Sequence, residues 1–117
     1  MEIGETLYVT TRGQFREWLH KHHASSREIW LVQYKKATGK PTLPFEQALE
    51  EAICFGWIDS SMKRMDAERY ATRFSPRRPR SNWTETNRAR ARRMIALGKM
   101  TEAGLARLPV DFEQPEG

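Results

Sequence analysis

The sequence has almost no cysteine and no long apolar run, and both shortages exclude whole classes of protein. Among 117 residues there is one cysteine, Cys54, so neither an internal disulfide nor a CxxC metal site can form. No apolar stretch approaches the roughly 20 residues that a membrane-spanning helix needs. The first ten residues have no basic start and no long apolar stretch, so we expect no secretory signal. A lone cysteine is typical of a reducing compartment, which predicts a cytoplasmic protein.

The short motifs that mark common enzymes and cofactor sites are absent as well. There is no GxSxG, HExxH, P-loop or GxGxxG pattern. Cys54 falls near the predicted end of a helix, where a reactive thiolate is disfavoured. His20, His22 and His23 cluster at another helix end, where the helix dipole favours imidazolium, and they have no third metal ligand nearby. The sequence therefore favours a protein that is not an enzyme, and it predicts neither a metal nor a cofactor.

Arginine, by contrast, is concentrated in one segment. The formal net charge of the chain is +5, yet residues 73–93 hold eight arginines and a single acid, Glu85, which is a segment charge of +7. The remainder of the chain therefore sums to −2. The planar guanidinium pairs bidentately with carboxylate or phosphate and stacks on aromatic rings. Two interpretations stay open, a solvated face and an anion-binding surface.

Apolar periodicity predicts an α+β fold. Spacings of three and four predict helices that begin near Thr11, Pro44, Thr84 and Thr101, with Gly56 ending the second helix in a left-handed conformation. Alternation predicts strands over 28–35, 57–64 and 69–75, and Leu7 and Val9 suggest a short edge strand. We expect a small antiparallel sheet of three or four strands with about four helices mostly on one face. Trp30 and Tyr34 are expected to pack on the first helix. The chain reads as one domain, 1–117, with a frayed tail from about residue 109.

The arginine-rich segment supplies the candidate site. Pro76 and Pro79 favour an extended path, and the N–H groups at the following helix entry favour anions. The predicted anion-binding residues are Arg73, Arg77, Arg78, Asn82, Trp83 and Thr84. The predicted pocket lining is Trp57, Asp59 and Lys63, which alternate onto one face of the hairpin, with Arg73 pairing across to Asp59. The alternative is that both tryptophans are core residues and that the arginines pair with acids such as Asp59, Glu50 and Glu51.

Three stretches carry a resemblance to a known family. AICFGWID at 52–59, RFSPRRPRSNW at 73–83 and GKMT at 98–101, in this order, resemble the YdeI/OmpD-associated family, also called bacteriocin-protection proteins. The resemblance implies a stress-protection or binding role linked to antimicrobial-peptide resistance, without assigned catalytic residues. An unidentified anionic ligand is the partner that the arginines predict. The alternative function is a nucleic-acid-binding module that uses residues 73–93, because interleaved arginine and aromatic side chains suit phosphates and bases.

Overall fold

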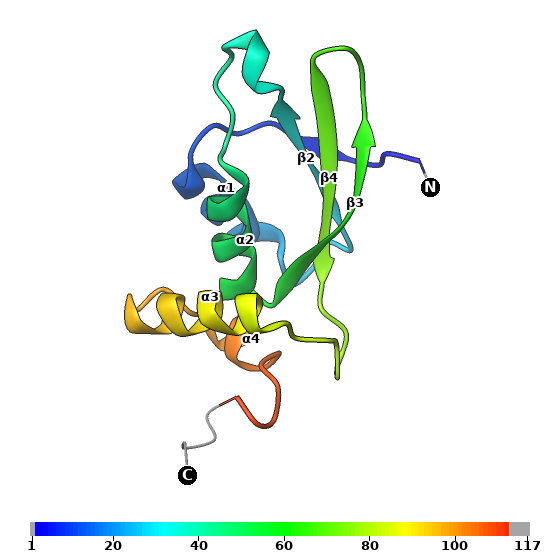
Figure 1. The fold of residues 1–117 in the computed structure, drawn as a ribbon. Helices are drawn as coiled ribbons and strands as arrows, with labels where there is room; N and C mark the ends of the chain where they lie inside the picture. Colours follow the sequence, from blue (N-terminus) through cyan, green and yellow to red (C-terminus); the bar gives the residue numbers. More distant parts are fainter. Residues whose placement is uncertain (1, 113–117) are drawn as a thin grey trace.

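A four-stranded sheet covered on one face by helices forms the body of the protein (Figure 1). The computed structural model describes residues 2–112. In chain order the elements are β1 (Thr6–Leu7), α1 (Arg12–His22), β2 (Ile29–Tyr34), the short 3-10 helix η1 (Lys36–Thr38), α2 (Phe45–Cys54), β3 (Trp57–Arg64), β4 (Arg69–Pro76), α3 (Glu85–Ala96) and α4 (Glu102–Leu105). The predicted α+β fold is confirmed. Among the described residues no helix is long and apolar enough to cross a membrane.

The strand order is β1-β2-β4-β3, with β2 near the middle. β2 pairs antiparallel with β4, and β4 pairs antiparallel with β3. The edge strand β1 pairs parallel with β2, because α1 carries the chain back along the sheet between them. The sheet is therefore mixed, rather than antiparallel throughout as the sequence suggested.

Local sequence signals account for where the helices begin and end. Thr11 caps α1 in a capping box with Gln14. Thr84 caps α3 by accepting a hydrogen bond from the Asn87 N–H. Gly56 follows α2 with φ +74°, so the prediction of a left-handed glycine after this helix is confirmed.

The main core lies between the sheet and the helices α1 and α2. Phe15 of α1 is fully buried against Phe74 of β4, with ring centres 5.4 Å apart, and Ile29 and Leu31 of β2 belong to the same cluster. The prediction that Trp30 packs on α1 is wrong, because β2 presents its odd-numbered apolar residues to the helices. The alternation of the strand places Trp30 on the opposite face of the sheet.

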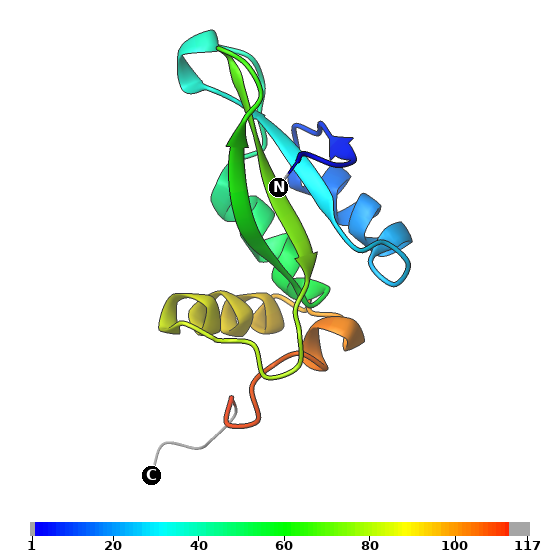
Figure 2. The same ribbon diagram turned by 90° about the vertical axis from the view of Figure 1, so that its right-hand side faces the viewer.

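On the helix-free face of the sheet, the N-terminal segment runs over Trp30 of β2. Figure 2 looks onto this face and shows that segment on the viewer's side, with α2 behind the sheet. The segment runs so close that a Cβ on Gly4 would collide with Glu28 Oε2 and would lie 3.6 Å from the Trp30 ring. Trp30 is accordingly 0% exposed although no helix covers it.

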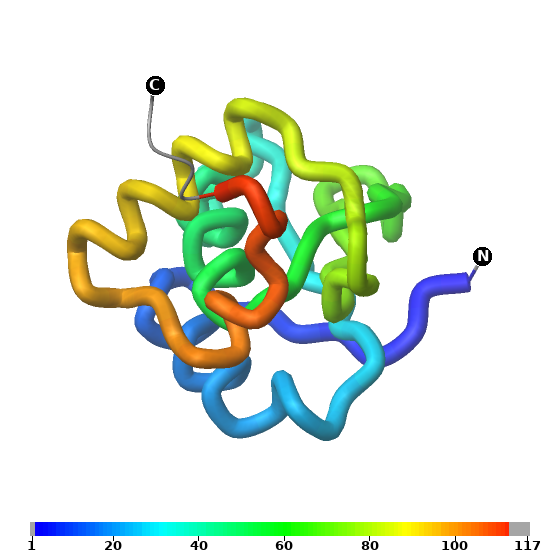
Figure 3. Tube along the Cα trace, turned by 90° about the horizontal axis from the view of Figure 1, so that it is seen from below, coloured from blue at the N-terminus to red at the C-terminus, as the bar shows by residue number. Residues whose placement is uncertain are grey.

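The C-terminal part packs across the end of α2 (Figure 3). A second apolar cluster joins Ile53 of α2, Ala91 of α3 and Phe112. The Phe112 N–H donates to the Pro109 carbonyl at 3.0 Å, and Phe112 is buried. The tail expected to fray from about residue 109 is therefore packed as far as Phe112, and its remainder, 113–117, lies outside the described residues.

Candidate functional site

Residues 76–83 connect β4 to α3, and we call them the arginine loop. The Arg77 N–H donates to the Gly56 carbonyl at 2.8 Å, which anchors the start of the loop beside α2. The loop then turns back, because the Ser81 N–H reaches the Arg78 carbonyl at 3.1 Å. Arg80 lies in this turn with φ +63°, a left-handed conformation that is strained for a residue with a side chain. The loop is a tight turn here, rather than the extended path that its prolines suggested.

Arg77 is the central side chain of the arginine loop. It is 2% exposed, and its guanidinium carbon lies 3.7 Å from the centre of the Trp83 ring. Its Nη1 donates to Ser81 Oγ at 3.1 Å and to the Asn82 carbonyl at 3.3 Å. Within residues 2–112, its Nε and Nη2 have no hydrogen-bond partner. Burial lowers the pKa of Arg77 to about 10, against the opposing effect of the Asp59 carboxylate.

The two unpartnered nitrogens of Arg77 form one chemical feature. Nε–H and Nη2–H point the same way and make the edge with which a guanidinium grips a carboxylate or phosphate bidentately. Leaving buried donors unpaired costs roughly 1–3 kcal/mol each, and more when they are charged. The stacked ring and the Nη1 contacts hold the guanidinium in this orientation. Within residues 2–112, this edge of the guanidinium is left without an acceptor.

A pocket of about 240 Å³ lies beside the arginine loop, and Arg77 is not among its lining residues. Ser81 and Trp83, both in contact with Arg77, line the pocket together with Arg80, Arg107 and the segment 108–110. The Trp83 Nε1 donates to the Arg107 carbonyl at 3.1 Å, which joins the arginine loop to the C-terminal part. Arg80 and Arg107 add positive charge to a wall that is otherwise mostly apolar. Sequence reasoning missed Arg107, which lies 14 residues beyond the arginine-rich segment.

Arg73 lies outside this group. Its Nε pairs with Glu28 Oε1 at 2.5 Å, and this contact lowers the pKa of Glu28. The predicted pair between Asp59 and Arg73 is wrong. Asp59 is the register partner of Phe74, so its side chain shares the helix-covered face of the sheet, whereas Arg73 points to the other face.

The residues predicted to line a pocket, Trp57, Asp59 and Lys63, do not lie together either. Trp57 is 1% exposed and packs edge-on against Trp18, 5.7 Å between ring centres, so it is a core residue. A register shift between Asp59 and Met62 interrupts the alternation of β3. Lys63 is the partner of Ala71 and therefore lies on the face opposite to Trp57 and Asp59.

The structure brings together Arg77, Trp83 and the main chain of Asn82, with Asp59 near enough to act on the charge of Arg77. Thr84 serves as the cap of α3, and Arg78 is exposed on the outside of the loop. Of the residues predicted to bind an anion, the structure therefore groups only Arg77, Trp83 and the main chain of Asn82.

Most other arginines of residues 73–93 have carboxylate partners. Besides Arg73, four of the eight make ion pairs: Arg88 with Asp111 at 3.1 Å, Arg90 with Glu46 at 2.7 Å, Arg92 with Glu85 at 2.6 Å and Arg93 with Glu50 at 3.0 Å. Arg78 and Arg80 make none within the described part of the chain. The alternative of arginines paired with acids is correct for this larger group, including the predicted acid Glu50.

One protein family matches most of this α+β chain. A family model described as a domain of unknown function, DUF8412, matches residues 7–107. The chain therefore belongs to that family, and the match spans the sheet, the arginine loop and both C-terminal helices. No curated protein matches the chain, and no solved structure matches it.

Proposed function

We propose that this protein is a non-enzymatic binding protein whose arginine loop takes up a small anionic ligand, with Arg77 as the anchor. The observation that carries the proposal is the buried Nε and Nη2 edge of Arg77, unpartnered within residues 2–112. A stress-protection role of the YdeI/OmpD-associated kind, in the cytoplasm, is the cellular setting that we propose for it. The sequence motifs 52–59 and 73–83 support that setting, and the second of them contains the arginine loop.

An anion fits this site better than a neutral ligand does. In the closed loop, Trp83 and Ser81 hold the guanidinium in one orientation, which leaves its Nε and Nη2 edge for an anion. Charge-assisted hydrogen bonds to a buried guanidinium are also roughly twice as strong as neutral ones. Because both free nitrogens are enclosed, the ligand enters when the arginine loop opens. Arg80, strained at φ +63°, lies in the part of the loop that has to move.

Nucleic-acid binding is the second candidate. It is supported by the exposed Arg78 and Arg80 beside Trp83. Against it, five of the eight arginines in residues 73–93 are engaged with carboxylates, so the segment is not a continuous cationic strip. A steep salt dependence of binding to single-stranded oligonucleotides would favour this candidate over the small-anion site.

Calorimetry on the full chain tests the proposal, with inorganic phosphate and sulfate as probes. The wild type should bind at least one of them saturably. Arg77→Lys keeps a positive charge but loses the bidentate edge, so we expect affinity to fall by about tenfold or more. Arg78→Lys, at an exposed position of the same loop, is the matched control and should bind as the wild type does. Equal binding by Arg77→Lys, or no saturable binding by the wild type, contradicts the proposal.

A further inference from the structure

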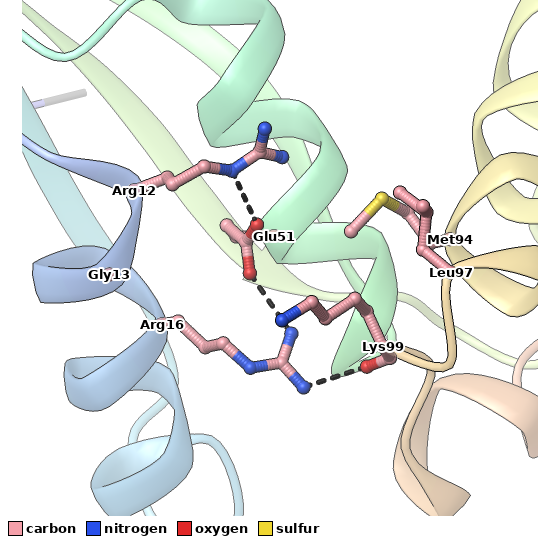
Figure 4. Close-up of a pocket in the computed structure, with 7 residues that line it drawn as sticks. All are labelled: Arg12, Gly13, Arg16, Glu51, Met94, Leu97 and Lys99. Atoms are coloured by element: carbon pink, nitrogen blue, oxygen red, sulfur yellow. Dashed lines mark hydrogen bonds and ion pairs between the residues drawn. The ribbon is translucent and has the colours of Figure 1, made fainter.

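A second pocket lies between α1, α2 and the segment that follows α3 (Figure 4). Its volume is about 200 Å³, and its lining residues are Arg12, Gly13, Arg16, Glu51, Met94, Leu97 and Lys99. It shares no lining residue with the pocket beside the arginine loop. Nothing in the proposed function uses it.

The charges around this pocket do not balance. Glu51 is 3% exposed and accepts from Arg12 Nε at 2.8 Å and from Arg16 Nη1 at 3.0 Å, so both of its oxygens are engaged. Glu50 is 5% exposed and accepts from Arg12 at 2.6 Å and from Arg93 at 3.0 Å. Three arginines therefore share two carboxylates.

Lys99 adds a fourth positive charge at the rim. The Lys99 carbonyl accepts from Arg16 Nη2 at 2.7 Å, and Figure 4 shows its side chain extending back toward the Arg16 guanidinium. Within residues 2–112 the Lys99 ammonium makes no ion pair. With Glu50 and Glu51 already saturated, the pocket has a surplus charge of +2. An anion between Lys99 and Arg16 would offset their mutual repulsion.

The opposite wall of the pocket is apolar. Met94 is buried beneath it, and Leu97 is 54% exposed beside it. Leu97 thus remains exposed in a pocket that is also lined by Arg12, Arg16 and Lys99. This combination suits a ligand that has both an anionic group and an apolar part. Water or inorganic phosphate could bind the cationic groups, but it would leave the apolar side chain of Leu97 exposed to solvent.

We propose that this pocket binds a small organic carboxylate with an apolar body. Lys99 and Arg16 hold the carboxylate, and the apolar body lies on Leu97 and Met94. Arg12 contributes to the positive field while it remains bound to Glu50 and Glu51.

Calorimetry on the full chain at low ionic strength, with hexanoate as the probe, tests this assignment. Hexanoate should bind saturably below about 50 mM. Acetate should bind about tenfold more weakly, because it lacks the apolar chain. Hexylammonium, with the same chain and the opposite charge, should not bind. Equal binding of hexylammonium and hexanoate, or no saturable hexanoate binding, overturns the proposal.

Two variants locate the ligand. Lys99→Met keeps the carbonyl that holds Arg16 and removes the ammonium, and it should weaken hexanoate binding by about fivefold. Leu97→Asn should weaken hexanoate binding but leave acetate binding unchanged. Leu105→Asn is the matched control, because Leu105 is 51% exposed and lies outside the pocket. Arg77→Lys should bind hexanoate here as the wild type does, which separates this site from the one at the arginine loop. Hexanoate binding unaffected by Lys99→Met and Leu97→Asn would refute the location.

Discussion

Two regions of the molecule hold arginines in close contacts, and they differ in what the guanidinium contacts and in how deeply it is buried. Between α1, α2 and α3, the buried carboxylates Glu50 and Glu51 accept from three arginines. In the arginine loop, Arg77 is more deeply buried than any of those three and meets a tryptophan ring, a hydroxyl and a carbonyl. The first region consists of Glu50 and Glu51 with Arg12, Arg16 and Arg93. We call it the clamp, because its ion pairs join the three helices. The second has a buried charge without a countercharge in contact.

The difference shows that the number of arginines says little about function until each has been matched with its acid. Residues 73–93 carry a charge of +7 in the sequence, yet most of that charge is neutralised by acids that are distant along the chain, such as Glu28 and Glu46. A guanidinium that remains buried without a carboxylate costs stability. We therefore expect that removing a charge between α1, α2 and α3 lowers the free energy of unfolding, whereas removing the charge of Arg77 raises it.

The largest effect is expected in the clamp. Glu51→Gln leaves Arg12 and Arg16 without their shared carboxylate, and we expect the free energy of unfolding to fall by roughly 2–3 kcal/mol. Urea denaturation would measure it. Glu46→Gln is the control, since Glu46 is 58% exposed and its pair with Arg90 should contribute less than about 1 kcal/mol. Equal losses in both variants would mean that the clamp stabilises no more than a surface pair does.

The next effect tests the anchor of the arginine loop. Gly56→Ala places a Cβ 2.8 Å from the Ala103 carbonyl at a φ of +74°, and we expect a loss of about 2 kcal/mol. Because the Gly56 carbonyl holds the Arg77 N–H, anion binding at the arginine loop should weaken as well. Gly39→Ala, at φ +69° with open space around it, separates backbone strain from the steric clash and should lose less. Thermal unfolding of both variants decides between these outcomes.

Gly56 also shows what local sequence could predict. A helix that runs into a strand within two residues needs a left-handed residue between them, and only glycine adopts that conformation cheaply. The caps at Thr11 and Thr84 and the hairpin of β3 and β4 follow from equally short-range rules. These features depend on residues within about four positions of each other, so they can be predicted without knowing the fold.

The predictions that were wrong concern features that depend on long-range packing. Trp30 could not be assigned to a face, because both faces of β2 are apolar and the N-terminal segment covers Trp30 on the second face. The Asp59–Arg73 pair required the hairpin register, which shifts between Asp59 and Met62. The burial of Arg77 depends on Trp83 and on the segment after α4, to which Trp83 is bonded. Arg77 could be selected as a candidate from the sequence, but not distinguished from Arg73.

A smaller effect of opposite sign is expected at the arginine loop. Arg77→Met removes a buried charge that has no carboxylate and keeps apolar contact with Trp83, so without ligand the protein should become more stable by about 1 kcal/mol. Arg12→Met is the matched variant and should destabilise, because it takes a partner from Glu50 and Glu51. Urea denaturation of both variants in phosphate-free buffer measures whether each substitution raises or lowers the free energy of unfolding. A destabilised Arg77→Met would mean that its bonds to Ser81 and Asn82 outweigh the cost of its burial.

The smallest effect concerns acid and tests how far the ion pairs around α3 contribute. The hydrogen bond from Arg90 lowers the pKa of Glu46 below its ordinary value of 4.5 in the folded state. A carboxyl with a lowered folded pKa stabilises the protein above the unfolded value, and this contribution is lost as the pH falls through the folded value. Because Glu46 is largely exposed, we expect a loss of only a few tenths of a kcal/mol between about pH 5 and pH 3. Denaturation of wild type and Glu46→Gln across that range measures it, and the gap between the two curves should narrow as the pH falls. A constant gap would show that Arg90 contributes nothing to stability through the charge of Glu46.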